Sequence, residues 1–123
     1  MRIDDLQIYR DARGAELFLL DLTDNFAKKY KFNTADRMII QGWEMLDEVI
    51  AGCVEREPQS KINHFTAALI ALSRLDTKMQ LAAVKNQVTN EHLGQWMEIT
   101  NRIRRQLEGL VNSLQKKVRQ SAL

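Results

Sequence analysis

The chain of 123 residues has few residues that favour turns, with one proline and five glycines, and a single cysteine for cross-links. So few prolines and glycines leave little room for turns, which favours long helices. The single Cys53 excludes an internal disulfide framework and fits a reducing compartment. No apolar run approaches the roughly 18 residues of a membrane span, and the charged N-terminus does not resemble a signal peptide. We therefore expect a single cytoplasmic domain over residues 1–123, with no membrane association.

Apolar residues recur instead at the helical period of 3.6, and no segment shows sustained strand alternation. Four amphipathic segments are predicted as helices, at about residues 5–30, 35–56, 59–86 and 90–118. In the breaks between them, Asn33 or Thr34 can cap the second helix, and Pro58 can end the second or begin the third. Thr89 and Asn90 are candidate caps for the fourth. Similar lengths and short connections predict an all-α fold, an antiparallel up-down four-helix bundle.

Asp76 interrupts the apolar stripe of the third predicted helix. That stripe consists of Phe65, Leu69, Leu72, Leu75, Met79 and Ala83. A carboxylate on a core-facing stripe is costly unless it is paired. In a hairpin that turns near residues 87–90, Asp76 faces residues 101–104 of the last helix, where Arg104 borders the core. We predict a partly buried structural pair of Asp76 and Arg104, and the alternative is a functional carboxylate.

The first two predicted helices carry more apolar residues than one core-facing stripe needs. The surplus positions proposed as an oligomer interface are Leu6, Leu17, Leu20 and Trp43. Such a surplus predicts a second packed surface and hence self-association. The alternative is a bulky core or scattered exposure.

Charge is segregated along the chain. Residues 33–57 have a net charge of −4 and residues 100–123 a net charge of +5. The predicted basic stripe of the last helix consists of Arg102, Arg105, Lys116 and Arg119, with Arg104 and Lys117 at its edges. The second helix carries an acidic face with Glu44, Asp47 and Glu48, a candidate surface for a basic protein partner. The basic stripe is either a contact for nucleic-acid phosphates or a solvated helix face.

Motifs for catalysis are weak. His64 and His92 lie on different predicted helices, and neither belongs to a metal-binding His-Glu-x-x-His pattern. No Gly-rich loop precedes a helix to hold phosphate, and Cys53 lies in an apolar stripe, where a small core residue is expected. We predict no catalytic residue, no metal site, no cofactor and no enzymatic activity.

The stretch "LQIYRDARGAELFLLDLTDNFAKKYKFNTADRM", followed by "EMLDEVIAG", resembles the start of a bacterial four-helix-bundle family. This family includes proteins encoded by intervening sequences of large-subunit ribosomal RNA genes and the accessory variability determinant (Avd) proteins of diversity-generating retroelements. The likeness rests on Ile8-Tyr9 with Ala12, on Leu22-Thr23 with Phe26 and Lys28, on Asp36-Arg37, and on Leu72 to Asp76. Where many relatives have Phe-Pro-Lys, this chain has Phe26-Ala27-Lys28, and alanine can extend a helix that proline would end.

This resemblance implies a homopentameric ring of bundles. For the Avd branch it also implies binding to a reverse transcriptase and to RNA or DNA through a basic surface. The first expectation is therefore a retroelement accessory protein without enzymatic activity. The alternative is a family member that acts only as a protein-interaction or structural oligomer, with no nucleic-acid role.

Overall fold

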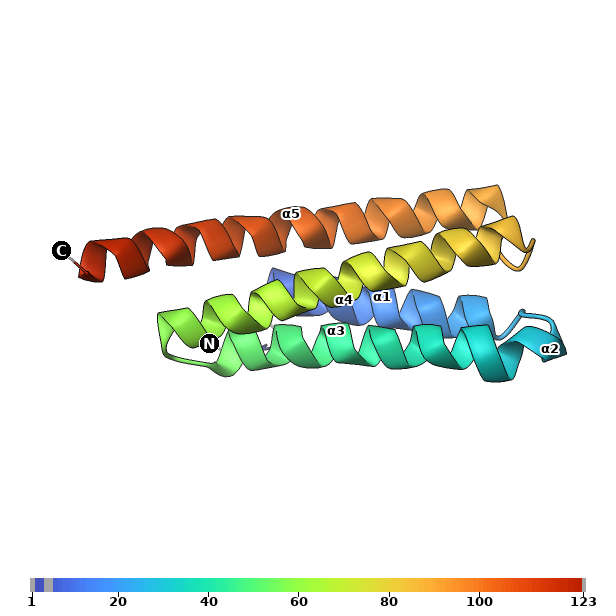
Figure 1. Ribbon diagram of the computed structural model, residues 1–123, viewed down its shortest axis with the longest axis horizontal. Coiled ribbons are helices and arrows are strands. Elements are labelled where there is room, and N and C mark those ends of the chain that lie inside the picture. The colour runs from blue at the N-terminus through green and yellow to red at the C-terminus, as the bar shows by residue number, and fades with distance from the viewer. Residues whose placement is uncertain (1, 4–5, 123) are drawn as a thin grey trace.

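The computed structural model describes residues 2–3 and 6–122, and these residues form helices and no strand. The elements are α1 (Gln7–Thr23), α2 (Lys28–Tyr30), the π-helix η2 (Lys31–Ala35), α3 (Asp36–Val54), α4 (Pro58–Val84) and α5 (Asn90–Ser121). Figure 1 shows α1, α3, α4 and α5 as long rods that alternate in direction along one axis. The prediction of an all-helical bundle is confirmed, whereas the ring of subunits stays a prediction.

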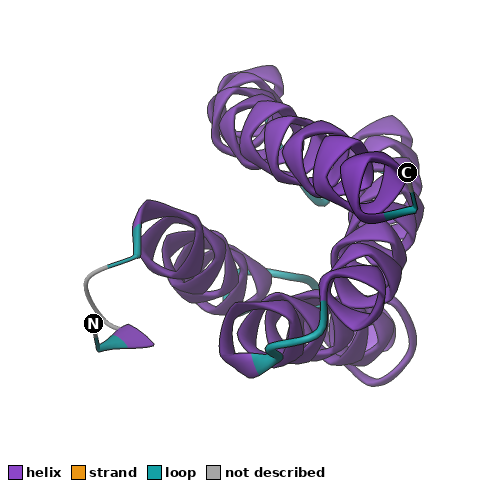
Figure 2. Ribbon diagram, turned by 90° about the vertical axis from the view of Figure 1, so that its left-hand side faces the viewer, coloured by secondary structure: helices purple, strands orange, loops and turns teal. Residues whose placement is uncertain are grey.

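Each long helix packs against the helices that precede and follow it, and α1 also contacts α5. The helices thus surround one core, whose fully buried large side chains are Leu19, Met38, Met45, Val49, Leu72, Leu75, Met79, Trp96, Thr100, Ile103 and Leu107. In Figure 2 the two termini lie on opposite sides of the molecule. Among the described residues of α5, none beyond Leu107 is buried, because α5 runs past the start of α1 (Figure 1).

Several helix ends follow the predicted signals. Pro58 is the first residue of α4, and the Glu57 side chain caps that helix by accepting from the Ser60 backbone N–H at 3.0 Å. Thr89 caps α5 by accepting from the His92 N–H at 3.0 Å, as predicted. Asn86 has φ 59° in the turn between α4 and α5, a conformation that asparagine tolerates better than most residues.

The first helix is shorter than predicted. It ends at Thr23 rather than near residue 30, and a new helical segment begins at Lys28. The Thr23 hydroxyl donates to the Leu19 carbonyl at 2.9 Å. Phe26 is buried, and the extended backbone of Ala27 donates its N–H to Gln87 Oε1 at 2.8 Å. The bond from Ala27 to Gln87 ties this break to the α4–α5 turn, and the break persists although alanine favours a helix.

The predicted cap at Asn33 or Thr34 is wrong. Both residues lie inside η2, which continues directly into α3, and no side chain caps α3. The helical segment begins earlier because the chain turns at Phe26 and Ala27. The other predicted bounds lie within three residues of those observed.

Candidate nucleic-acid and partner surfaces

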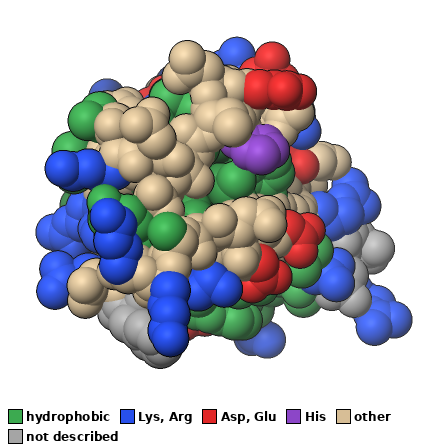
Figure 3. Space-filling model, turned by 90° about the vertical axis from the view of Figure 1, so that its right-hand side faces the viewer, with side chains coloured by type: hydrophobic (Ala, Val, Ile, Leu, Met, Phe, Trp, Pro, Cys, Tyr) green, Lys and Arg blue, Asp and Glu red, His purple; other side chains and the backbone are tan. Residues whose placement is uncertain are grey.

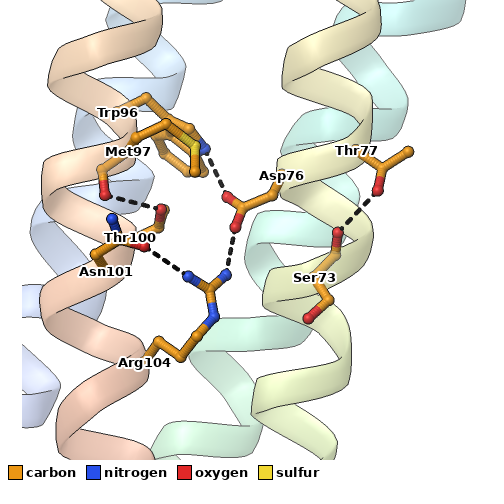
Figure 4. A network of polar contacts seen from close by, with 8 residues as sticks. All are labelled: Ser73, Asp76, Thr77, Trp96, Met97, Thr100, Asn101 and Arg104. Atoms are coloured by element: carbon orange, nitrogen blue, oxygen red, sulfur yellow. Dashed lines mark hydrogen bonds and ion pairs between the residues drawn. The ribbon is translucent and has the colours of Figure 1, made fainter.

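Asp76 lies on the core side of α4 and is only 6% exposed. Its Oδ2 accepts a hydrogen bond from Arg104 Nη2, so the predicted pair is confirmed. Its Oδ1 accepts from Trp96 Nε1 at 2.9 Å, and Arg104 Nη1 donates to Asn101 Oδ1 at 2.8 Å (Figure 4). Both carboxylate oxygens are therefore satisfied by donors from α5, which is how a buried charge becomes tolerable.

This network changes the role of Arg104. The sequence pattern puts the residue both in the pair and at the edge of the basic stripe, but its guanidinium points into the bundle toward Asp76 (Figure 4). The prediction that Arg104 is an available cation of the basic stripe is therefore corrected: Arg104 is a structural residue. The Trp96 donor was not predicted. Its signal was present in the sequence, since Trp96 lies eight residues, or about two helical turns, before Arg104 on α5.

The other five cations of the stripe are exposed. They are Arg102, Arg105, Lys116, Lys117 and Arg119, called here the basic stripe. No described Asp or Glu forms an ion pair with them. Arg102 and Arg105 precede Leu107, the last buried residue among those described in α5, whereas the other three follow it. The exposed cations of α5 thus extend over about 17 residues, or roughly 26 Å of helix.

One residue of the predicted acidic face of α3 already has a partner within the chain. Glu48 Oε2 lies 2.8 Å from His64 Nδ1 on α4, a partner that sequence reasoning missed. Glu44 is exposed and accepts from Gln41 Nε2 at 2.7 Å, and Asp47 is exposed. Glu44 and Asp47 are therefore more available to a partner protein than Glu48 is.

Two of the four predicted interface residues are well exposed on the single chain: Leu17 at 51% and Trp43 at 49%. Leu20 is half-buried, and Leu6 packs against the core. Leu6 therefore contributes in part to the core of the single chain and not only to an interface. Leu17 and Trp43 lie on α1 and α3, which contact each other.

Glu16 is a buried charge that the sequence did not reveal. It is 3% exposed on α1, and neither carboxylate oxygen has a hydrogen-bond partner among the described residues. The carboxylate lies against Gly42 of α3, where an added Cβ would be 1.9 Å from Glu16 Oε2. Burial raises the pKa of Glu16 to about 7, because the charged form is poorly solvated there.

Cys53 is partly buried, and burial raises the pKa of its thiol while nearby Lys61 acts in the opposite direction. The Lys61 ammonium donates to the carbonyls of Gly52 at 2.7 Å and Cys53 at 3.3 Å, and so stabilises the end of α3. Among the described residues, no group of three His, Cys, Asp or Glu side chains could hold a metal ion. None of the described helices has the length and apolar character that crossing a bilayer requires.

Comparisons with family models and with curated proteins give no match to this chain.

Proposed function

We propose that this chain is a non-enzymatic, self-associating helical protein that binds the phosphate backbone of nucleic acid through the basic stripe of α5. The observation that carries the proposal is the exposure of five cations on one helix, none of them in an ion pair with a described carboxylate. Cations that are not neutralised within the protein can replace the counterions condensed on a nucleic acid. The resemblance to the Avd family supports the same assignment.

The proposal includes a partner. In an Avd-like protein the partner is a reverse transcriptase, and the exposed Glu44 and Asp47 of α3 offer it a surface that repels nucleic acid. Self-association would repeat the basic stripe around an assembly, so that a small net charge per chain adds to a larger local field. A homopentameric ring is the assembly that the resemblance implies.

A titration by fluorescence anisotropy with single-stranded RNA and DNA tests this function. Binding should weaken steeply with salt, with a slope of up to about −3.5 in log K against log salt per engaged chain if all five cations meet phosphates. The affinity should depend little on base sequence, since an exposed helix face of this kind reads backbone rather than base edges.

Replacing Arg102 and Arg105 by glutamate should abolish binding without unfolding the bundle, because both side chains are exposed. The matched control is Arg13→Glu with Arg56→Glu, which makes the same change in net charge at exposed positions outside α5. If wild type does not bind at low salt, or the α5 variant binds as tightly as wild type, the nucleic-acid function is wrong.

A second candidate is a role in protein interaction alone. The exposure of Leu17 and Trp43 favours it, because a large aromatic side chain on a surface is typical of an interface anchor. Absence of nucleic-acid binding combined with a self-associated protein would select this second function.

A further inference from the structure

An open groove of about 660 Å³ lies between α4 and the segment formed by α2, η2 and the start of α3. It is separate from the basic stripe, since none of its lining residues belongs to α5. Its volume is in the range of sites that hold small organic ligands, about 300–1,000 Å³. Neither the acidic face nor the predicted interface uses this groove.

Four cations line the groove: Arg37, Arg74, Lys78 and Lys85. No acidic side chain is among its described lining residues. Figure 3 faces this end of the bundle and shows Lys and Arg side chains gathered along its left edge. This concentration of positive charge differs from an ordinary solvated helix face, on which charges of both signs alternate.

Three of these cations keep N–H groups that can donate hydrogen bonds to a ligand. Arg37 and Arg74 are exposed and form no ion pair with a described carboxylate. The Lys78 ammonium donates to Gln41 Oε1 at 3.1 Å, which leaves it two further donors. That bond links Lys78 of α4 to Gln41 of α3. Lys85, at the end of α4, has an ordinary role in balancing the helix dipole, so it contributes less to the argument.

Apolar surface lies beside these charges. Leu81 is 60% exposed although it lines the groove, and the half-buried Tyr30 lines it from α2. The Lys29 ammonium lies 5.1 Å from the centre of the Tyr30 ring, which helps to hold that ring in place. Thr77 and Asn33 add polar groups to the lining of the groove. The groove therefore offers a polyanion site next to a site for a flat apolar group.

We propose that this groove binds a nucleoside polyphosphate. The polyphosphate contacts Arg37, Arg74 and Lys78, because guanidinium groups form paired, charge-assisted hydrogen bonds with phosphate oxygens. The nucleoside lies along Tyr30 and Leu81, where its ring removes exposed apolar surface from water. The site would be independent of the phosphate-backbone contact proposed for α5.

Isothermal titration of the full chain at low salt tests the assignment with three probes: ATP without added metal ion, pyrophosphate and adenosine. ATP should bind most tightly, because it alone carries both the polyanion and the ring. The groove variant Arg37→Glu with Arg74→Glu should weaken ATP binding at least about tenfold, since two charge-assisted contacts become repulsive. The control variant Arg13→Glu with Arg56→Glu makes the same change in net charge at exposed positions outside both the groove and the basic stripe, and should bind ATP as wild type does.

A second variant, Leu81→Ser, separates the two halves of the site. It should weaken ATP binding and leave pyrophosphate binding unchanged, because Leu81 faces the ring and not the phosphates. Far-UV circular dichroism should show all variants as helical as wild type, since the substituted side chains are exposed.

Equal ATP binding by wild type and the groove variant would overturn the proposal, as would no ATP binding at low salt. Pyrophosphate that binds as tightly as ATP would overturn the nucleoside part. A single-stranded oligonucleotide provides the last arm of the test. If the groove variant loses oligonucleotide binding by the same factor as ATP, the groove belongs to a nucleic-acid surface instead. The α5 variant Arg102→Glu with Arg105→Glu tests the nucleic-acid function separately, so the two proposals can fail independently.

Discussion

Asp76 shows how one carboxylate can set the register of two helices. Its two oxygens accept from Trp96 and from Arg104, which lie two helical turns apart on α5. A shift of α5 by one turn would leave at least one of these buried groups without its partner. Such a penalty disfavours other registers more than the pair adds to overall stability.

Replacing Asp76 by alanine should therefore reduce the free energy of unfolding by about 3 kcal/mol, because two donors lose their acceptor. Chemical denaturation measures this loss. In a double-mutant cycle, Arg104→Leu should recover part of it, with a coupling of roughly 0.5–3 kcal/mol. Strictly additive effects would contradict an energetic pair. Asp76→Asn serves as the control that keeps one acceptor for Trp96.

Glu16 should make stability fall with rising pH. In the unfolded chain this carboxyl ionises near its ordinary pKa of 4.5, whereas in the folded protein its pKa is about 7. Between these values the folded state binds more protons than the unfolded state, so folding is favoured at acid pH and the advantage is lost toward pH 7. The full effect is at most about 3 kcal/mol.

Thermal unfolding of wild type and Glu16→Gln across this pH range measures the effect. The variant stays neutral, so it should be more stable than wild type above pH 7 and should lose this part of the pH dependence. Glu98→Gln removes an exposed carboxylate on α5 and serves as the control. Parallel pH profiles for wild type and Glu16→Gln would show that the buried carboxyl does not titrate as proposed.

At the scale of the helix, one glycine lies where two helices approach closely and another lies on open surface. A Cβ at Gly52 of α3 would lie 2.4 Å from the Phe65 ring of α4, so glycine is what lets the ring pack on the helix backbone. Gly109 of α5 has nothing within 4 Å of the same position. Substitution by alanine should therefore have opposite effects at the two positions.

Gly52→Ala should destabilise the protein by about 1–3 kcal/mol, because the Phe65 ring must move away. Gly109→Ala should stabilise it by up to about 1 kcal/mol, since alanine favours the helix and meets no obstacle. Denaturation midpoints compare the two variants directly. The contrast fails if both substitutions shift stability in the same direction.

At the scale of the whole molecule, the exposed apolar residues of α1 and α3 predict a larger assembly. Light scattering should give a mass that is a multiple of the 14.3 kDa chain, and the resemblance implies five chains. Leu17→Glu with Trp43→Glu should reduce the mass to that of one chain and keep the far-UV spectrum, because both side chains are half-exposed on the single chain. A wild-type monomer at micromolar concentration would refute self-association.

The helical period alone determined much of this protein. The spacing of apolar residues predicted the helices and most of their buried faces, and counting outward from the α4–α5 turn was enough to put Asp76 opposite Arg104. These inferences succeed because the positions of side chains along and around a helix are set by local geometry.

Only the tertiary structure decided the remaining features, because these features depend on contacts between residues far apart in the chain. The end of α1 at Thr23 depends on the buried Phe26 and on the hydrogen bond from Ala27 to Gln87, a contact across 60 positions. The burial of Glu16 depends on the missing side chain at Gly42, against which its carboxylate lies, and the cationic groove depends on how α4 packs beside η2. No local pattern encodes such contacts, since each is set by the packing of one element against another.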